Sequence, residues 1–180
     1  MCGRVIVLLG AHAGLRSGEM SALRWVNVDL NGEGLFVRES EWEGQAGPTQ
    51  GWEARYVPLS ADLLAALRPR QIRAVGPGMQ NDKGEPLTQN AVRSRLVVVA
   101  REAGVKHGVH ILRHTCVSLM LMAGVPVPVV QRITGHKNVS TMMRYVHLTD
   151  QSKRDAVATF NRTPAIASAG GATGEQGPPA

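Results

Sequence analysis

The chain has 180 residues, of which 43% are hydrophobic and 19% are charged. This length and composition fit one folded domain with its own core and exclude a disordered chain, while an aromatic content of only 4% argues against an all-β fold. Twenty basic and 14 acidic side chains leave a net charge of +6, which is typical of proteins that meet nucleic acid or an anionic membrane surface.

Two helices joined by a tight turn are predicted at the start of the chain. Residues 5–13 have the apolar content of a buried helix closed by Gly14, and Ser17 is placed to cap a second helix that reaches Trp25. The first apolar run is barely long enough for a secretory signal peptide and its pattern continues into the next helix, so we reject that alternative. No run approaches the roughly 20 apolar residues of a membrane-spanning helix.

A small antiparallel hairpin is predicted next. Residues 34–40 and 55–57 have the pattern of its two strands, and the polar segment between them contains glycine and proline. Ser60 then caps a helix that ends at about Leu67, before an irregular connector that begins at Pro69.

The second half of the sequence predicts further helices, most of which end at a glycine. They are 89–103 after Thr88, 110–123 before Gly124, 127–134 before Gly135, a short helix after Ser140, and 150–160. From residue 163 onward the chain is mainly Ala, Gly, Ser, Thr and Pro, which predicts a disordered tail at 163–180. The expected fold class is mainly α with a small antiparallel β-sheet insert, an α+β domain.

Charge is distributed unevenly along the chain. Residues 1–67 carry five basic and eight acidic side chains, whereas residues 68–180 carry 15 and six, so the second part is the predicted contact for a polyanion. Sixteen of the 20 basic residues are arginine, which favours bidentate contacts to phosphate. The two cysteines, Cys2 and Cys116, form no disulfide framework or metal-binding pattern, and this favours a reducing, cytoplasmic location.

The first candidate site is the turn Gly14-Leu15-Arg16-Ser17-Gly18-Glu19. Backbone N–H groups at the start of a helix favour an anion, and Glu19 follows Arg16 by one turn, where it can hold the guanidinium in place. Taken alone, the same pattern also fits a structural or merely exposed arginine.

The second candidate site is the segment His110-Ile111-Leu112-Arg113-His114. Its spacing puts His110 and Arg113 on one face of a helix, where both can reach one small anion, and turns Ile111 and Leu112 more toward the core. A zinc site of His110 and His114, with or without His107, is the alternative, although Arg113 between the ligands would repel a cation. The same residues also fit a third interpretation, in which they are ordinary surface histidines that bind no ligand.

The third candidate is the pair Gly135-His136 followed by Tyr145-Val146-His147. Taken singly, Tyr145 fits a core aromatic residue whose hydroxyl bonds at the surface. That interpretation does not explain why one tyrosine accompanies two arginines and two histidines in separated motifs, with no acidic metal cage near them.

In this order and at these separations, the three candidates resemble the catalytic domain of tyrosine site-specific recombinases, the phage integrase family. The resemblance runs from about residue 5 to about residue 155, and Tyr56-Val57-Pro58-Leu59 resembles the family's exit from its small sheet. It implies a catalytic domain at 1–162 that lacks the separate DNA-clamping domain of family members. It also implies recombination or integration at specific DNA sites, a homo-tetramer on double-stranded DNA, and no cofactor or metal.

The resemblance further implies a role for each site residue. Tyr145 attacks a phosphodiester to form a 3′-phosphotyrosyl enzyme, and Arg16 and Arg113 bind the non-bridging oxygens. Glu19 orients Arg16. The resemblance also implies that His110 transfers a proton or forms a hydrogen bond with the phosphate.

His136 is implied as a hydrogen-bond partner of the transition state. The family's general-acid lysine falls at or beside Gln50 in this chain, so either Arg55 or water substitutes, or strand cleavage is impaired. Two alternatives follow from the residues: a non-catalytic DNA-binding remnant of an integrase, and an enzyme like a type IB topoisomerase.

Overall fold

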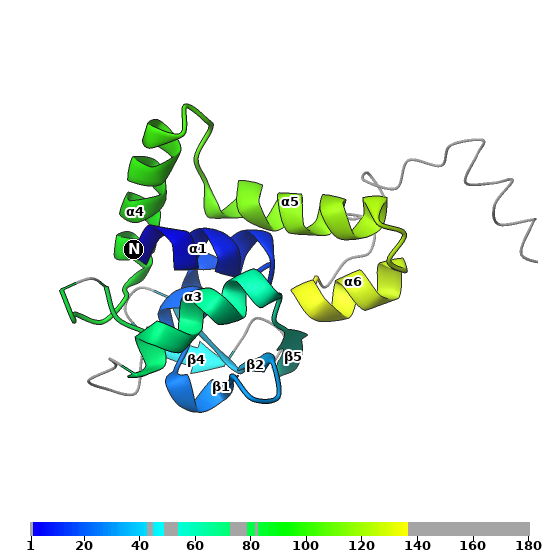
Figure 1. Cartoon of the computed structure of the whole chain (residues 1–180), viewed down its shortest axis with the longest axis horizontal. Coiled ribbons are helices and arrows are strands. Elements are labelled where there is room, and N and C mark those ends of the chain that lie inside the picture. Colours follow the sequence, from blue (N-terminus) through cyan, green and yellow to red (C-terminus); the bar gives the residue numbers. More distant parts are fainter. Residues whose placement is uncertain (1, 43–44, 49–53, 73–78, 82, 137–180) are drawn as a thin grey trace, which may run out of the picture. The chain divides into compact units, whose positions relative to one another are not determined.

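The computed structural model describes residues 2–42, 45–48, 54–72, 79–81 and 83–136. All of them belong to the first of two compact units of the chain, residues 1–146. Gln50, Tyr145, the two helices predicted after residue 139 and the predicted tail at 163–180 lie outside the described residues. Within the described part, the domain is mostly helical with a small antiparallel sheet, as the sequence predicts (Figure 1).

Helices form both ends of the described chain and strands lie between them. The helices are α1 Cys2–Ala11, α2 Ser17–Ser21, the 3-10 turn η1 Trp25–Asn27, α3 Ala61–Ile72, α4 Gln89–Glu102, α5 Val109–Met122 and α6 Val127–Thr134. The strands are β1 Val28–Asp29, β2 Gly34–Val37, β3 Glu39–Trp42, β4 Gln45–Pro48 and β5 Arg55–Pro58. No helix among the described residues is long and apolar enough to cross a membrane.

The predicted caps Ser60 and Thr88 are confirmed, whereas the first helix, predicted at 5–13, is observed at Cys2–Ala11. The hydroxyl of Thr88 accepts a hydrogen bond from the backbone N–H of Ala91 at 3.2 Å, and that of Ser60 accepts one from Leu63 at 3.3 Å. The prediction that the helix after Ser60 ends at about Leu67 is wrong, because α3 continues through Pro69 to Ile72. Pro69 is exposed and removes only a single backbone hydrogen bond from the last turns of α3.

The second predicted helix is shorter than expected. It ends at Ser21, and Trp25 begins the separate turn η1. Ser17 is its first residue and not its cap. The N-cap residue is Arg16, whose backbone N–H donates to the carboxylate of Glu19 at 2.9 Å. The chain leaves the helix where Leu23 enters the core and its carbonyl accepts the N–H of Met79 at 3.1 Å.

The predicted hairpin is wrong in its connection but right in its pairing. Strands β2 and β5 pair antiparallel, with Leu35 opposite Val57 and Phe36 opposite Tyr56. The segment between them forms its own antiparallel ladder, β3–β4, and β1 adds a third strand to give the order β1-β2-β5. Two-residue and Gly- or Pro-containing strands show little periodicity, so only backbone pairing reveals them.

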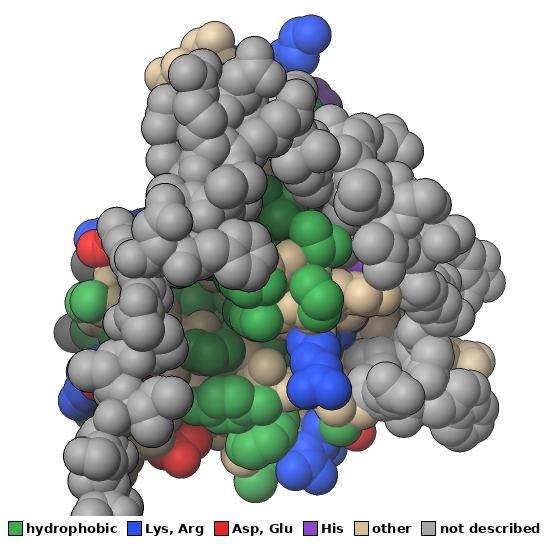
Figure 2. All heavy atoms as spheres, turned by 90° about the vertical axis from the view of Figure 1, so that its right-hand side faces the viewer, with side chains coloured by type: hydrophobic (Ala, Val, Ile, Leu, Met, Phe, Trp, Pro, Cys, Tyr) green, Lys and Arg blue, Asp and Glu red, His purple; other side chains and the backbone are tan. Residues whose placement is uncertain are grey.

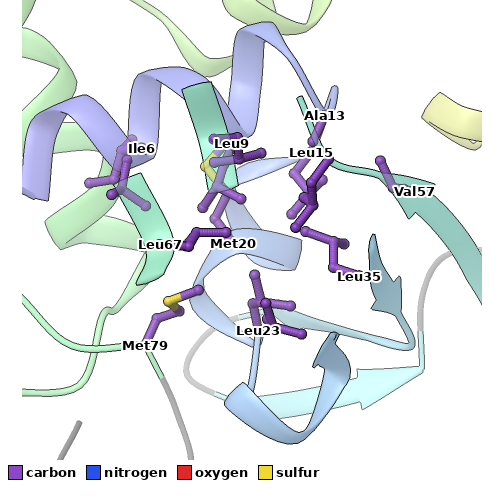
Figure 3. Close-up of a cluster of buried hydrophobic side chains, with 14 of the residues drawn as sticks. Ile6, Leu9, Ala13, Leu15, Met20, Leu23, Leu35, Val57, Leu67 and Met79 are labelled. Atoms are coloured by element: carbon purple, nitrogen blue, oxygen red, sulfur yellow. The ribbon is translucent and has the colours of Figure 1, made fainter. Parts of the chain in front are cut away.

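Apolar side chains from most of these elements meet in one core. Figure 3 shows them converging from α1, α2, α3 and the sheet; the labelled residues are Ile6, Leu9, Ala13, Leu15, Met20, Leu23, Leu35, Val57, Leu67 and Met79. Helix α1 contacts α3, α4 and α5. A second, smaller cluster centred on Val117 and Val130 joins α5 to α6. The two clusters hold the start of α2, the second turn of α5 and the end of α6 in fixed positions.

Candidate active site

Glu19 and Arg16 form the first part of the candidate site, at the start of α2. Arg16 precedes the helix in an extended conformation, and its Nη1 donates to Oε1 of Glu19 at 2.9 Å. The Nη2 atom of Arg16 donates to the carbonyl of Gly135 at 2.9 Å, although 119 residues separate the two in the sequence. Glu19 is only 1% exposed, so its carboxylate is a buried charge that needs partners.

Arg55 supplies the other partner of Glu19, and sequence reasoning missed this role. Its Nη1 and Nη2 donate to the two carboxylate oxygens of Glu19 at 2.9 and 2.7 Å, and its Nε donates to the carbonyl of Ile133 at 2.9 Å. Arg55 is two residues before the buried Val57 in β5, and strand alternation alone would have placed it on the inner face. With its donors engaged in this way, Arg55 is a poor substitute for the general-acid lysine.

Arg113 enters the cluster from the second turn of α5. The guanidinium is 4% exposed; Nη1 donates to the carbonyl of Gly14, and Nε donates to Nε2 of His136 at 3.3 Å. Its Nη2 is buried and has no hydrogen-bond partner among the described residues. Burial, together with the charge of Arg16, lowers the pKa of Arg113 to about 9, so the group stays charged at neutral pH.

Gly14 is required by the turn that meets Arg113. Its φ of +64° lies in the left-handed region, which favours glycine. A Cβ atom at this position would lie 2.9 Å from Cγ2 of Thr134 and 3.4 Å from Sγ of Cys116. The turn after α1 is therefore packed between α5 and the end of α6, which brings the carbonyl of Gly14 to Arg113.

His136 is held as a neutral imidazole with a defined tautomer. The single hydroxyl hydrogen of Thr134 is donated to the carbonyl of Val130 at 2.7 Å, so its oxygen accepts Nδ1–H of His136 at 2.7 Å. The Nε2 atom then carries the lone pair that accepts from Arg113. Burial lowers the pKa of His136 to about 4, and the positive charges of Arg113 and Arg16 lower it in the same direction.

The cluster carries an excess of positive charge. Burial alone would raise the pKa of Glu19, but the hydrogen bonds and charges of Arg55 and Arg16 outweigh burial and lower it. Glu19 is therefore ionised at neutral pH and balances one of the three guanidinium groups, Arg16, Arg55 and Arg113. With His136 neutral, the cluster has a net charge of +2, which suits an anionic ligand.

The structure brings some of the predicted residues together and leaves others apart. Arg16, Glu19, Arg113 and His136 meet in this cluster. His110 lies exposed in the first turn of α5, and no hydrogen bond joins it to the cluster among the described residues. Gln50 and Tyr145 cannot be placed, because both lie outside the described part of the chain.

The predicted inward orientation of Ile111 is wrong. Its side chain is 42% exposed, whereas α5 buries Val109, Arg113, Cys116 and Val117. The helix turns its charged arginine inward because Gly14 and His136 there accept hydrogen bonds from it. The zinc interpretation finds no support in the described residues, where no three His, Cys, Asp or Glu side chains gather to hold a metal ion.

Comparison with known proteins matches residues 1–152 to the phage integrase family. Tyrosine recombinase XerC of Staphylococcus saprophyticus is 31% identical over 160 residues, which cover 84% of this chain and 51% of that protein. XerC of Xylella fastidiosa is 30% identical over 151 residues, which cover 81% and 48%. The chain spans about half the length of these curated relatives.

Solved structures have the same fold at low sequence identity. The Tn1549 transposon integrase, in complex with a circular intermediate DNA, has a TM-score of 0.71 at 19% identity and covers 87% of this chain and 57% of its own. The crystal structure of XerA recombinase has a TM-score of 0.65 at 24% identity and covers 88% and 56%. These likenesses confirm the predicted fold class.

Proposed function

Because this chain belongs to the phage integrase family, we propose that it contains the catalytic domain of a tyrosine recombinase, at residues 1–162. The domain cleaves and rejoins double-stranded DNA at specific sites through a 3′-phosphotyrosyl intermediate. Its relatives at about 30% identity are tyrosine recombinases, and the Tn1549 integrase was solved with DNA. The proposal includes a homo-tetramer assembled on DNA in the cytoplasm.

One observation carries this proposal: Nη2 of Arg113 is buried and has no partner within residues 2–136 as far as the structure describes them. A buried N–H group without a partner is costly, and the cost is greater when the group is charged. The charge of Arg16 also acts on Arg113, so an anion that binds there meets guanidinium groups from two separate segments. A phosphodiester has the charge and the acceptor oxygens that this site lacks.

The charge of the cluster also suits the reaction. The phenolate oxygen of Tyr145 attacks phosphorus and the 5′-oxygen of the DNA leaves with a proton, so the phosphotyrosyl bond replaces the phosphodiester bond and no ATP is needed. The pentacoordinate transition state carries two negative charges, one from the phosphodiester and one from the phenolate. The net charge of +2 of the cluster formed by Arg16, Arg55, Arg113 and Glu19 balances them.

The proposal assigns separate roles to the two histidines and to the basic side chains on the surface. His110 transfers a proton or donates to the phosphate. His136 bonds the transition state only after Nε2 releases Arg113 and takes up a proton, because an unprotonated Nε2 accepts and cannot donate to a phosphate oxygen. Basic side chains form adjoining groups on the face that Figure 2 shows, beside hydrophobic ones. Such groups contribute phosphate contacts that are independent of base sequence, so DNA affinity should fall steeply with salt.

A suicide DNA substrate, whose cleavage releases a short fragment, tests the proposal. The chain and a Gln50→Lys variant are incubated with it, and the covalent protein–DNA adduct is measured; we expect Gln50→Lys to raise the yield. Tyr145→Phe should abolish the adduct. Tyr56 is the other tyrosine of the chain, and its exposed hydroxyl bonds only the carbonyl of Gly32, so Tyr56→Phe is the matched control.

Three results would contradict the proposal. An adduct that persists in Tyr145→Phe would refute the assigned nucleophile. Binding of DNA without any adduct, even with Gln50→Lys and an added clamp domain, would favour the DNA-binding remnant. Relaxation of supercoiled DNA without site preference would favour the topoisomerase alternative.

A further inference from the structure

Arg55 connects the candidate site to the end of α6, although the reaction outlined above assigns it no part. Its guanidinium forms a fork with Glu19, and its Nε caps the carbonyl of Ile133, 78 residues away in the sequence. The side chain is 10% exposed. A group this buried, with all three nitrogens engaged, is not arranged to reach DNA itself.

The two-pronged contact between Arg55 and Glu19 determines whether the charge of Arg16 is available to a phosphate. Both oxygens of Glu19 are shared between Arg16 and Arg55, and Arg55 supplies the two-pronged contact that balances the carboxylate. Without Arg55, the only guanidinium bonded to the buried carboxylate would be that of Arg16. Arg16 would then be neutralised by Glu19, and the net charge facing a phosphate would fall from +2 to +1.

The contact with Ile133 determines where His136 lies. The last carbonyls of a helix lack partners within the helix, and cations are favoured at this end. Arg55 caps Ile133 and Arg16 caps Gly135, whose φ of +67° ends α6. A Cβ on Gly135 would lie 2.9 Å from Nη1 of Arg55, so the turn that leads to His136 rests directly on this guanidinium.

We propose that Arg55 is a positioning residue for strand cleavage, which keeps Arg16 available to the phosphate through Glu19 and holds the end of α6 so that His136 meets Arg113. This inference rests on the proposed function and adds a residue that acts through others. In this proposal Arg55 acts on the reaction only through Glu19, Arg16 and the end of α6. Its loss should therefore slow the chemical step much more than it weakens DNA binding.

The first test is the rate of adduct formation with saturating suicide substrate, at a temperature where every variant is folded. Arg55→Met should lower the rate about 100-fold, with a change of less than about threefold in the Kd for duplex DNA. Arg24→Met is the matched control, because it removes one positive charge from an exposed ion pair. Arg55→Lys keeps the charge but loses the two-pronged contact with Glu19, so its rate should lie between those of the wild-type protein and Arg55→Met. It replaces Arg55→Met in this test if that variant does not fold.

The double variant Arg55→Met with Glu19→Gln separates positioning from general damage. Removing the carboxylate charge frees Arg16, so the rate should recover about tenfold relative to Arg55→Met alone. A role confined to stability would leave the rate of the folded protein unmoved by either change. No recovery in the double variant would overturn the proposal.

A second readout is independent of cleavage. The ring nitrogen signals of His136 in NMR spectra are assigned with His136→Gln. The Nε2 signal should shift in Arg55→Met, because Nε2 loses the hydrogen bond from Arg113, while Thr134 keeps the proton on Nδ1 in both proteins. If the wild-type chain forms no adduct, the proposed function fails for this chain and these signals alone decide the role of Arg55. Signals that are the same in both proteins would overturn it.

Discussion

The apolar core and the charged cluster are both buried, but they are stabilised in different ways. In the core, side chains such as Leu9, Leu63 and Leu67 are fully buried, and their contacts have no required direction. In the cluster, Glu19 receives four hydrogen bonds from Arg16 and Arg55, each with its own geometry. A lost methyl group in the core leaves a cavity, whereas a lost partner in the cluster leaves a buried charge unpaired.

This difference shows which region holds the fold and which one prepares the site. The core brings α1, α2, α3 and the sheet together by burying apolar surface, and many similar side chains would serve. The cluster connects α2, β5 and α6 at single atoms, and Nη2 of Arg113 finds no partner in the part of the chain that the structure describes. Variants that act on only one region can test this separation.

The largest effect is expected from Glu19→Ala, which breaks the cluster at its centre. Arg55 would keep a buried charge without its carboxylate, and the N–H of Arg16 would lose its cap, so the free energy of unfolding should fall by about 3–5 kcal/mol. Chemical denaturation of the purified protein measures this change. A loss of less than about 1 kcal/mol would show that the cluster does not stabilise the domain.

Leu67→Ala is the matched change in the core. It should cost about 2–5 kcal/mol, because Leu67 is fully buried, yet the folded protein should form adduct at the wild-type rate. Glu19→Ala should lower both quantities. Equal losses of adduct rate in Leu67→Ala and Glu19→Ala would contradict the view that the core holds the fold while the cluster prepares the site.

An intermediate effect is expected from pH, through His136. Its pKa is about 4 in the folded chain against an ordinary value of 6.5, because burial and the charges of Arg113 and Arg16 disfavour the imidazolium. Between these values the unfolded chain binds the proton more tightly, so stability should decrease as pH falls from 6.5 to 4. Denaturation at several pH values should show a shallower decrease for His136→Gln. Parallel curves for the two proteins would contradict the prediction.

The smallest effect is expected from Arg24→Met. Arg24 and Glu39 form an ion pair at 3.6 Å, with side chains 51% and 37% exposed, so water screens the pair in part even though Oε2 of Glu39 itself is buried. The free energy of unfolding should change by less than about 1 kcal/mol. A loss as large as that of Glu19→Ala would mean that burial does not distinguish these two sets of ion pairs.

Local patterns predicted much of the fold. Thr88 and Ser60 cap helices, and Gly124 and Gly135 follow the ends of α5 and α6, because these features depend on neighbours in the sequence. The ladder β3–β4 was missed because its short strands have no apolar alternation. The outward position of Ile111 was missed because helical spacing defines a face but not which face is buried.

The residue types of the candidate site could be identified from the sequence, and Arg16, Glu19, Arg113 and His136 do meet. The family resemblance made that possible, since each motif alone fitted an ordinary structural role. The fork of Arg55 on Glu19 could not be predicted, because its partners are 36 and 78 residues away and no local pattern joins them. The roles of His110, Gln50 and Tyr145 stay predictions.

The sequence by itself determined the helical character of the domain, its caps and its family motifs, because these depend on residues close together along the chain. Only the tertiary structure decided that Arg55 balances Glu19, that Thr134 sets the tautomer of His136 and that one donor of Arg113 is unpaired among the described residues. Each of these depends on a hydrogen bond between side chains or carbonyls of particular orientation. Such a bond exists only when packing has brought both partners within about 3 Å of each other.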